Sequence, residues 1–188
     1  MIDSSSSSSS TLDDLRQKGN YEFQKGNLDN AVIFYTSAIE QAIETKENQA
    51  LIINCCNRSA CYFQMEEFEQ AKEDAVLAWQ QSNKSNVKAA YRLSKTLLAL
   101  NDFKTAMETL KDALSIESLQ EKEIQSLQEL LKQAKEKYGR PNPEKETTIK
   151  DVDRPVSIRE FHKSKTIGYV QKSSSNSALL DKAMNGLA

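Results

Sequence analysis

Glycine and proline are scarce in this sequence, with five and three residues respectively among 188. A fold made of many β-turns needs more turn-forming residues than this, so an all-β architecture is disfavoured. No segment approaches the ~20 consecutive apolar residues that a membrane span requires. The net charge of −2 also lacks the basic excess that is typical of dedicated nucleic-acid binders. We therefore expect an all-α protein that contacts neither a membrane nor a nucleic acid.

Cysteine and histidine are rare as well, which removes most metal and catalytic chemistry. Cys55, Cys56 and Cys61 lack the spacing of a disulfide framework or a zinc site, so we interpret them as small apolar residues of one helix. The single histidine, His162, has no group of Cys, Asp or Glu at ligand spacing around it. There is no glycine-rich phosphate-binding loop. The sequence thus predicts no catalytic residue, no metal site and no cofactor-binding residue, and therefore no enzyme.

Both ends of the sequence differ from its centre. Residues 1–10 form a serine-rich leader that we expect to be disordered, since it contains nothing to bury in a core. This leader has no basic start and no apolar segment, so it does not resemble a targeting signal, and we expect a cytoplasmic location. Pro141 and Pro143 follow the last helical pattern, and residues 139–188 are polar, with nine Lys or Arg against six Asp or Glu. We expect this tail to be mostly disordered.

One part of the tail has a helical pattern. Leu180, Ala183, Met184 and Leu187 share one helical face, so the alternative to disorder is a short docking helix over 177–187. In that case the segment 141–188 provides a second site for a partner or folds back on the protein.

The central 11–138 contains an internal repeat. Ala31, Ala71 and Ala106 mark equivalent points, 40 and 35 residues apart. Each unit reads as helix, turn, helix, and the turns fall at 26–27, 66–67 and 101–102. Each turn precedes a large apolar residue (Leu28, Phe68, Phe103), and small residues stand in the first helix of each unit (Gly19, Ser59, Ser94). Alanine at these positions permits close crossing of two helices, so the pattern predicts stacked helix pairs.

A further helix is expected to follow the repeats. Apolar residues step by three and four between charged ones (Ile124, Leu127, Leu131, Ala134, Tyr138), which suits a helix that covers the exposed end of an array. The predicted boundaries are 12–45, 52–85 and 87–118 for the repeats and 119–138 for the cap helix, giving seven helices in total.

These units resemble the tetratricopeptide repeat (TPR), whose usual length is 34 residues. The resemblance covers about 12–117 and rests on the small residue, the alanines and the aromatic residues Tyr35 and Tyr62. Two departures are that the usual leucine before the glycine is replaced by Lys18 and Arg58, and that no proline closes a repeat. The resemblance implies a right-handed superhelical solenoid of three TPR helix pairs plus a C-terminal capping helix, with flexible tails.

Five polar residues fall on the face that the first helix of each repeat presents to the concave surface. They are Arg16, Asn20, Asn57, Lys88 and Arg92. Cations together with amide donors suit the carboxylates of a chain-terminal Asp. These residues resemble the dicarboxylate clamp of co-chaperones in this family, with arginine at position 16 where lysine is commoner. The resemblance implies a non-enzymatic adaptor for the C-terminal Glu-Glu-Val-Asp of the seventy- and ninety-kilodalton cytosolic heat-shock chaperones.

Other interpretations of this face stay open at the level of sequence. The protein is alternatively a scaffold or regulatory subunit that binds a different acidic peptide. An import receptor is a further alternative, although no span or lipidation motif is present to anchor it. A last alternative is that the five residues form a solvated basic face that binds no ligand.

Overall fold

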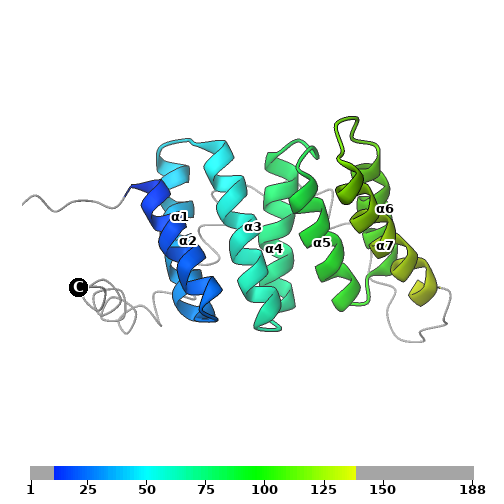
Figure 1. The fold of residues 1–188 in the computed structure, drawn as a ribbon, viewed down its shortest axis with the longest axis horizontal. Coiled ribbons are helices and arrows are strands. Elements are labelled where there is room, and N and C mark those ends of the chain that lie inside the picture. Colours follow the sequence, from blue (N-terminus) through cyan, green and yellow to red (C-terminus); the bar gives the residue numbers. More distant parts are fainter. Residues whose placement is uncertain (1–10, 139–188) are drawn as a thin grey trace, which may run out of the picture.

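Seven helices account for most of the residues that the structure, a computed structural model, describes, namely residues 11–138 (Figure 1). The helices are α1 (Leu12–Gln24), α2 (Leu28–Glu44), α3 (Asn48–Gln64), α4 (Phe68–Gln81), α5 (Val87–Ala99), α6 (Phe103–Leu114) and α7 (Glu121–Tyr138). No strand occurs within this range. None of the described helices is long and apolar enough to cross a membrane. The residues predicted to form the leader and the tail lie outside the described range.

The turns inside the three repeats share one backbone geometry, at the places predicted. Gly26, Glu66 and Asn101 each have a positive φ, between 60° and 80°. The next N–H in each case bonds back to a carbonyl of the preceding helix (Asn27 to Glu22, Glu67 to Tyr62, Asp102 to Leu97), at 2.9 Å. This is the hydrogen-bond pattern that ends many helices, usually with glycine in the left-handed position. Only one of the three turns here uses glycine, so backbone hydrogen bonding rather than residue type fixes the geometry.

Buried alanines bring the two helices of each repeat together. Ala31, Ala71 and Ala106 are fully buried, as the repeat pattern requires. Trp79 is also buried, in the larger of two core clusters, so it contributes to packing between repeats. Each helix packs mainly on the helices before and after it in sequence. The predicted fold class, an all-α solenoid of three TPR helix pairs with a capping helix, is therefore confirmed.

The buried stripe of the capping helix agrees only in part with the one predicted. Leu127, Leu130 and Ala134 are its buried residues, whereas Ile124 and Leu131 are only half-buried. Tyr138, expected on the apolar face, is 56% exposed. The prediction for Tyr138 is wrong because it stands at the last position of α7, where the apolar stripe has already ended.

A buried ion pair inside the second repeat is also hydrogen-bonded to the first repeat. Arg58 on α3 donates Nε and Nη2 to the two carboxylate oxygens of Asp74 on α4, at 2.8 and 2.7 Å. Its Nη1 donates to Oγ1 of Thr36 on α2, at 2.9 Å. Burial alone would lower the pKa of Arg58, but the Asp74 carboxylate overcomes that effect and raises it. The unusual Arg58, at a position where the repeat family has leucine, thus joins three helices through one guanidinium.

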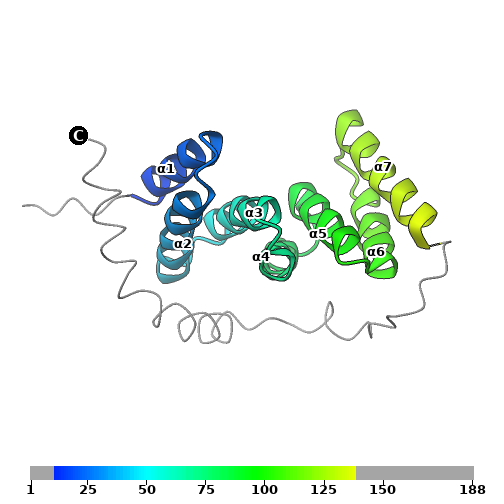
Figure 2. The same cartoon turned by 90° about the horizontal axis from the view of Figure 1, so that it is seen from below.

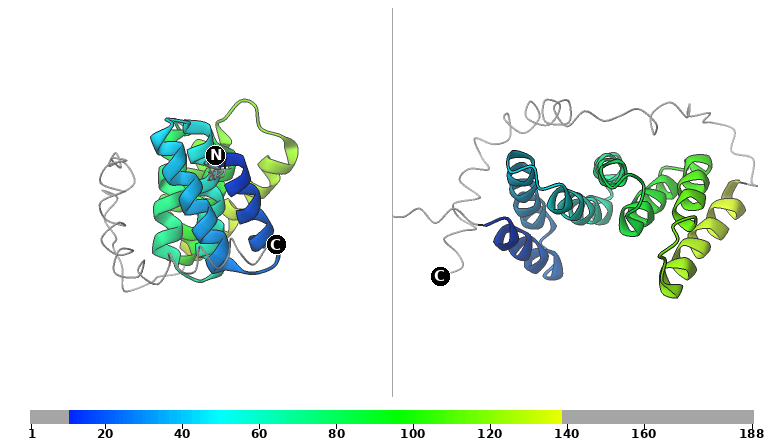
Figure 3. Two further views of the ribbon diagram at one scale, coloured as in Figure 1. Left: turned by 90° about the vertical axis from the view of Figure 1, so that its left-hand side faces the viewer. Right: turned by 90° about the horizontal axis from the view of Figure 1, so that it is seen from above.

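The row of helices is curved. Figure 2 shows α1, α3, α5 and α7 on one side and α2, α4 and α6 on the other. Both ends of the row, α1 and α7, bend toward the first side, and the opposite view in Figure 3 agrees. Side chains on α3 and α5 that point to this side therefore lie at the floor of a concave surface.

Candidate peptide-binding site

The five predicted site residues come from three helices of the concave side. Arg16 and Asn20 lie on α1, Asn57 on α3, and Lys88 and Arg92 on α5. We call these five residues the clamp cluster. Four of them are half-buried, and Lys88 is exposed. The first helix of each repeat therefore contributes at least one member.

A continuous run of hydrogen bonds crosses the three helices. Lys88 Nζ donates to Asn57 Oδ1 at 2.8 Å, and Asn57 Nδ2 donates to Asn20 Oδ1 at 3.3 Å. The same Asn20 oxygen accepts from the hydroxyl of the buried Tyr35 on α2, at 2.7 Å. These contacts occupy the acceptor oxygen of each asparagine. They leave the Asn20 amide N–H groups as donors without a partner among residues 11–138, which is the arrangement that a carboxylate ligand needs.

Tyr35 reaches Asn20 because residue 19 is glycine. A Cβ atom on Gly19 would lie 2.6 Å from Cε1 of the Tyr35 ring. Any larger residue would push the ring, and with it the hydroxyl, away from Asn20. Tyr35 was noted in the sequence only as part of the repeat signature, and its contact with the clamp cluster was not predicted.

The cations of the clamp cluster are close enough to affect one another. Although the Lys88 side chain is exposed overall, the surrounding protein desolvates its ammonium group and lowers its pKa, and the positive charges of Arg92 and Arg16 lower that pKa further. Arg16 also affects Tyr35, because its positive charge counteracts the burial that raises the pKa of the Tyr35 hydroxyl. The site therefore concentrates positive charge in the free protein.

Two of the cations differ in how they are partnered. Arg16 forms an ion pair with Asp13, one turn earlier on α1, where the carboxylate is 59% exposed. An exposed pair of this kind stabilises the fold little and competes weakly with a ligand. Arg92 is different, since its Nε is buried and has no hydrogen-bond partner. Such an unpaired donor carries a free-energy cost, which a shift of the side chain toward an incoming acceptor would remove.

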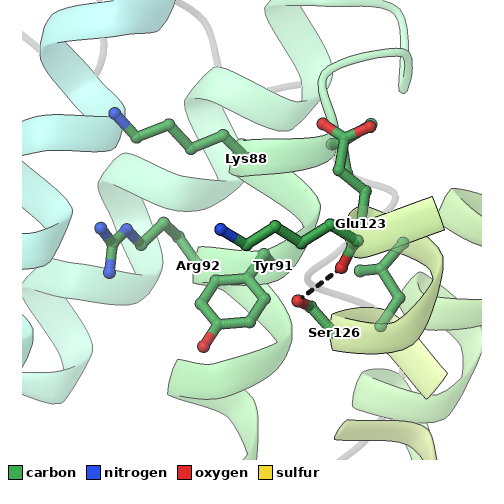
Figure 4. A pocket seen from close by; sticks show the side chains of 8 residues that line it. Lys88, Tyr91, Arg92, Glu123 and Ser126 are labelled. Atoms are coloured by element: carbon green, nitrogen blue, oxygen red, sulfur yellow. Dashed lines mark hydrogen bonds between the residues drawn. The ribbon is translucent and has the colours of Figure 1, made fainter. Parts of the chain in front are cut away.

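A pocket of about 260 Å³ adjoins the clamp cluster on its α7 side (Figure 4). Lys88 and Arg92 line it together with the apolar side chains of Val87, Tyr91 and Leu127. In Figure 4 the charged ends of Lys88 and Arg92 extend toward α3, away from α7. This pocket was not predicted, because it depends on how the cap helix packs against α5.

Lys122 of α7 also lines this pocket and brings a further cation to the concave side. Its ammonium group has no ion-pair partner among residues 11–138. In the sequence the charged residues of the cap helix served only to mark off its apolar face, so Lys122 was missed as a candidate site residue.

The three cysteines lie beneath this surface and carry no chemistry of their own. All three are buried free thiols, in agreement with their interpretation as core residues. Burial raises the pKa of Cys56 to about 11 and that of Cys61 to about 12, which keeps these thiols protonated and unreactive at neutral pH. Among residues 11–138 no group of three His, Cys, Asp or Glu side chains is placed to hold a metal ion.

Stacked helix pairs with a polar cluster on the concave side define the chain as a TPR protein. More particularly, the chain belongs to the Iml2/Tetratricopeptide repeat protein 39 family, whose model matches residues 13–162. That match includes all seven helices except the first residue of α1 and continues past the described range.

The chain is also similar to other curated proteins and to solved TPR domains. Protein unc-45 homolog B of Danio rerio is 29% identical over 116 residues, which are 62% of this chain but only 12% of that protein. The first TPR domain of Spaghetti (RPAP3), solved with the HSP90 peptide SRMEEVD, has a TM-score of 0.59 and 23% identity over 69% of this chain and 94% of that one. The TPR2B domain of yeast Sti1, solved as a complex with pHsp70, has the same TM-score and 24% identity, over 66% of this chain and 96% of that one. These structural likenesses establish the fold.

Proposed function

We propose that the protein is a non-enzymatic co-chaperone adaptor whose clamp cluster binds the C-terminal Glu-Glu-Val-Asp of heat-shock chaperones of the seventy- and ninety-kilodalton classes. The observation that carries the proposal is the hydrogen-bonded run through Lys88, Asn57, Asn20 and Tyr35, with Arg92 beside it. This run holds amide donors and cations on one concave surface, where a free C-terminal residue with an acidic side chain offers two carboxylates. A chaperone peptide bound to a relative of the same fold supports this choice of ligand.

The energetics are compatible with a transient adaptor. Each hydrogen bond between a carboxylate and a charged donor contributes roughly 1.5–3 kcal/mol. A few such bonds, reduced by the cost of ordering a flexible peptide, give affinities near the micromolar scale of about −8 kcal/mol. The unpaired Nε of Arg92 makes this residue the most informative one to remove.

The first experiment measures binding of a fluorescent peptide ending in Glu-Glu-Val-Asp by anisotropy. We expect the wild type to bind near micromolar and Arg92→Ala to bind at least about tenfold more weakly, since a charge-assisted contact is lost. Amidation of the peptide's C-terminus is expected to weaken binding similarly.

The matched control is Lys104→Ala, which removes one exposed positive charge from α6, on the opposite side of the row. It is expected to leave affinity unchanged. Binding that is indifferent to Arg92 and to the free carboxylate would reject the clamp. Such a result would favour the alternative of a scaffold that binds a different acidic peptide.

Binding is also expected to weaken at alkaline pH through Lys88. Its pKa in the free protein lies below the usual value of 10.5, and a bound carboxylate would raise it again by favouring the charged form. Affinity should therefore be constant below the lowered pKa and fall as the pH rises through it, because the neutral amine must then take up a proton on binding.

A titration of the dissociation constant from pH 7 to 10 tests this expectation. Lys88→Arg is the control, since an arginine keeps its charge over this range and should give a flat profile. Cys56 does not interfere, because its pKa of about 11 lies above the range. An equal decline in the wild type and Lys88→Arg would assign the pH dependence to another group.

Two further parts of the proposal concern location and the tail. We propose a cytoplasmic location, where the chaperones of these two classes meet their adaptors. We also propose that segment 141–188, which lies outside the described residues, offers a second partner site. Deleting it should change partner capture while the affinity of the clamp cluster for the peptide is retained.

A further inference from the structure

The cap helix α7 stands where a fourth repeat would begin. In each repeat the second helix begins four residues after the first one ends (24 and 28, 64 and 68, 99 and 103). Within residues 11–138 no helix follows α7, which ends at Tyr138 at the end of the row (Figure 2). The place that a second helix takes in the repeats is therefore not filled by this part of the chain.

A pocket of about 440 Å³ lies on α7, next to the end of α6. We call it the cap pocket. Its apolar part consists of Leu131 of α7 and Leu114, the last residue of α6. Both leucines pack against the larger core cluster, yet they are only half-buried. The cap pocket thus leaves apolar surface uncovered among residues 11–138.

Leu131 lies on the side of α7 where a second helix would pack. The buried residues of α7 have the same spacing as three buried residues of α5 (Leu127, Leu130 and Ala134 against Ala90, Leu93 and Leu97). This alignment places Leu131 at the position of Ser94. In the second repeat the equivalent Ser59 donates its hydroxyl to the carbonyl oxygen of Ala71, on the second helix of that repeat, at 2.8 Å.

The polar lining of the cap pocket carries a positive charge. It consists of Lys132, Lys135, Gln128 and Glu136, so the two lysines exceed the single carboxylate. Neither lysine has an ion-pair partner among residues 11–138. An occupant with apolar and acidic side chains therefore suits this pocket better than a basic one.

One stretch of the chain after α7 has this composition. Residues 144–153 hold four of the six acidic residues of 139–188 and only two lysines. The rest of 139–188 is basic, with seven Lys or Arg against two acidic residues. Ile149 and Val152 stand between the acidic residues of 144–153. The match to the family model extends to residue 162, so it includes this stretch as well.

The distance along the chain permits this stretch to reach the cap pocket. Leu131 lies seven residues before Tyr138, which is about 10 Å back along the helix. Ile149 follows Tyr138 by eleven residues, and an extended chain of this length spans up to about 36–40 Å. Pro141 and Pro143 are incompatible with a continued α7. The chain therefore has both a reason to leave the helix axis and ample length to return.

We propose that residues 144–153 dock in the cap pocket and cover the outer side of α7. Ile149 and Val152 fill its apolar part, and the acidic side chains lie beside Lys132 and Lys135. The chain thereby completes its last helix with its own residues. The inference does not depend on the clamp cluster, and it leaves residues 154–188 for the second partner site.

Disulfide trapping in the full chain tests the docking. Gln128→Cys places a thiol in the lining of the cap pocket, and Thr148→Cys places one in the docked stretch. The three native cysteines are buried and do not compete. With oxidised glutathione as the oxidant, the disulfide within one chain is followed by electrophoresis without reductant.

The matched control combines Thr148→Cys with Gln133→Cys. Gln133 is exposed and lies five residues after Gln128, about 140° around α7 and outside the lining of the cap pocket. We expect the first pair to form its disulfide at least about tenfold faster than the control pair, because docking raises the effective concentration of the thiols above that given by tethering alone.

Charge reversal in the trapping pair tests the ionic contacts. Lys132→Glu/Lys135→Glu should slow the disulfide about fivefold, since attraction becomes repulsion. Lys122→Glu/Lys137→Glu makes the same change of charge at two exposed lysines of α7 outside the lining and should leave the rate within about twofold.

A compensating variant separates the ionic contacts from damage to α7. Adding Asp151→Lys/Asp153→Lys to Lys132→Glu/Lys135→Glu reverses the charges on both sides and should restore the fast rate.

Two results would overturn the docking. One is an equal rate for the two trapping pairs, or a rate that ignores the charges at 132 and 135. The other is a covalent dimer in place of the disulfide within one chain, formed at a rate that rises with protein concentration, which would assign the cap pocket to a second copy of the protein.

Discussion

Replacing Asp74 with alanine is expected to lower the free energy of unfolding by about 3–5 kcal/mol, the usual cost of removing one partner from a buried ion pair. Arg58 is 3% exposed and would lose the two hydrogen bonds that Asp74 accepts. Arg58 cannot relieve the loss by becoming neutral, because its guanidinium stays protonated. The effect is large also because the same side chain binds Thr36 and so holds α2, α3 and α4 together.

Urea unfolding followed by Trp79 fluorescence measures this loss. Asp112→Ala is the matched control, since that carboxylate is 53% exposed in a 3.5 Å pair with Lys84 and should change stability by less than about 1 kcal/mol. The double variant Arg58→Met/Asp74→Leu removes both charges and should recover much of the stability. A small effect of Asp74→Ala would show that Arg58 finds other acceptors.

The second large effect is expected from Gly19→Ala. In a helix interior alanine is normally more stable than glycine by roughly 0.5–1 kcal/mol. Here the added Cβ would stand 2.6 Å from the Tyr35 ring, and overpacking typically costs about 1–3 kcal/mol. We expect a net loss of about 1–2 kcal/mol in the free energy of unfolding, together with weaker peptide binding, because the displaced ring no longer orients Asn20.

The repeats themselves supply the compensating variant. The third repeat has Ser94 at the position of Gly19 and Leu110 at the position of Tyr35, by their spacing from the shared alanine. Gly19→Ser/Tyr35→Leu should therefore be more stable than Gly19→Ser alone, yet bind the peptide weakly, since the hydroxyl is absent. A stabilised Gly19→Ala with unchanged affinity would contradict the proposed contact.

The sequence predicted the fold well because each repeat encodes the same local geometry. Alanine spacing and turn positions depend on contacts between helices that are neighbours in sequence, so periodicity alone located them. The cap helix was predicted less well. Its apolar residues fit more than one stripe, and only packing against α6 decided that Leu130 is buried and Tyr138 exposed.

That the five clamp residues bind a peptide stays a prediction. Their placement on three helices followed from the alignment of the repeats. Their supporting contacts could not be predicted in the same way. Arg58 read as a departure from the repeat pattern, and its partner Asp74 lies 16 residues later on another helix. Tyr35 contacts Asn20 across the two helices of the first repeat, and Lys122 lines the pocket between α7 and α5. Both placements depend on the three-dimensional packing of the helices.

The placement of the clamp cluster on α1, α3 and α5 also bears on how the molecule unfolds. In a linear array a terminal repeat can fray while the others stay folded, because each helix packs mainly on its neighbours in sequence. A ligand that touches all three helices binds only when all three repeats are folded. Such a ligand links their opening equilibria, so that an array able to melt piecewise behaves as one cooperative unit while it is occupied.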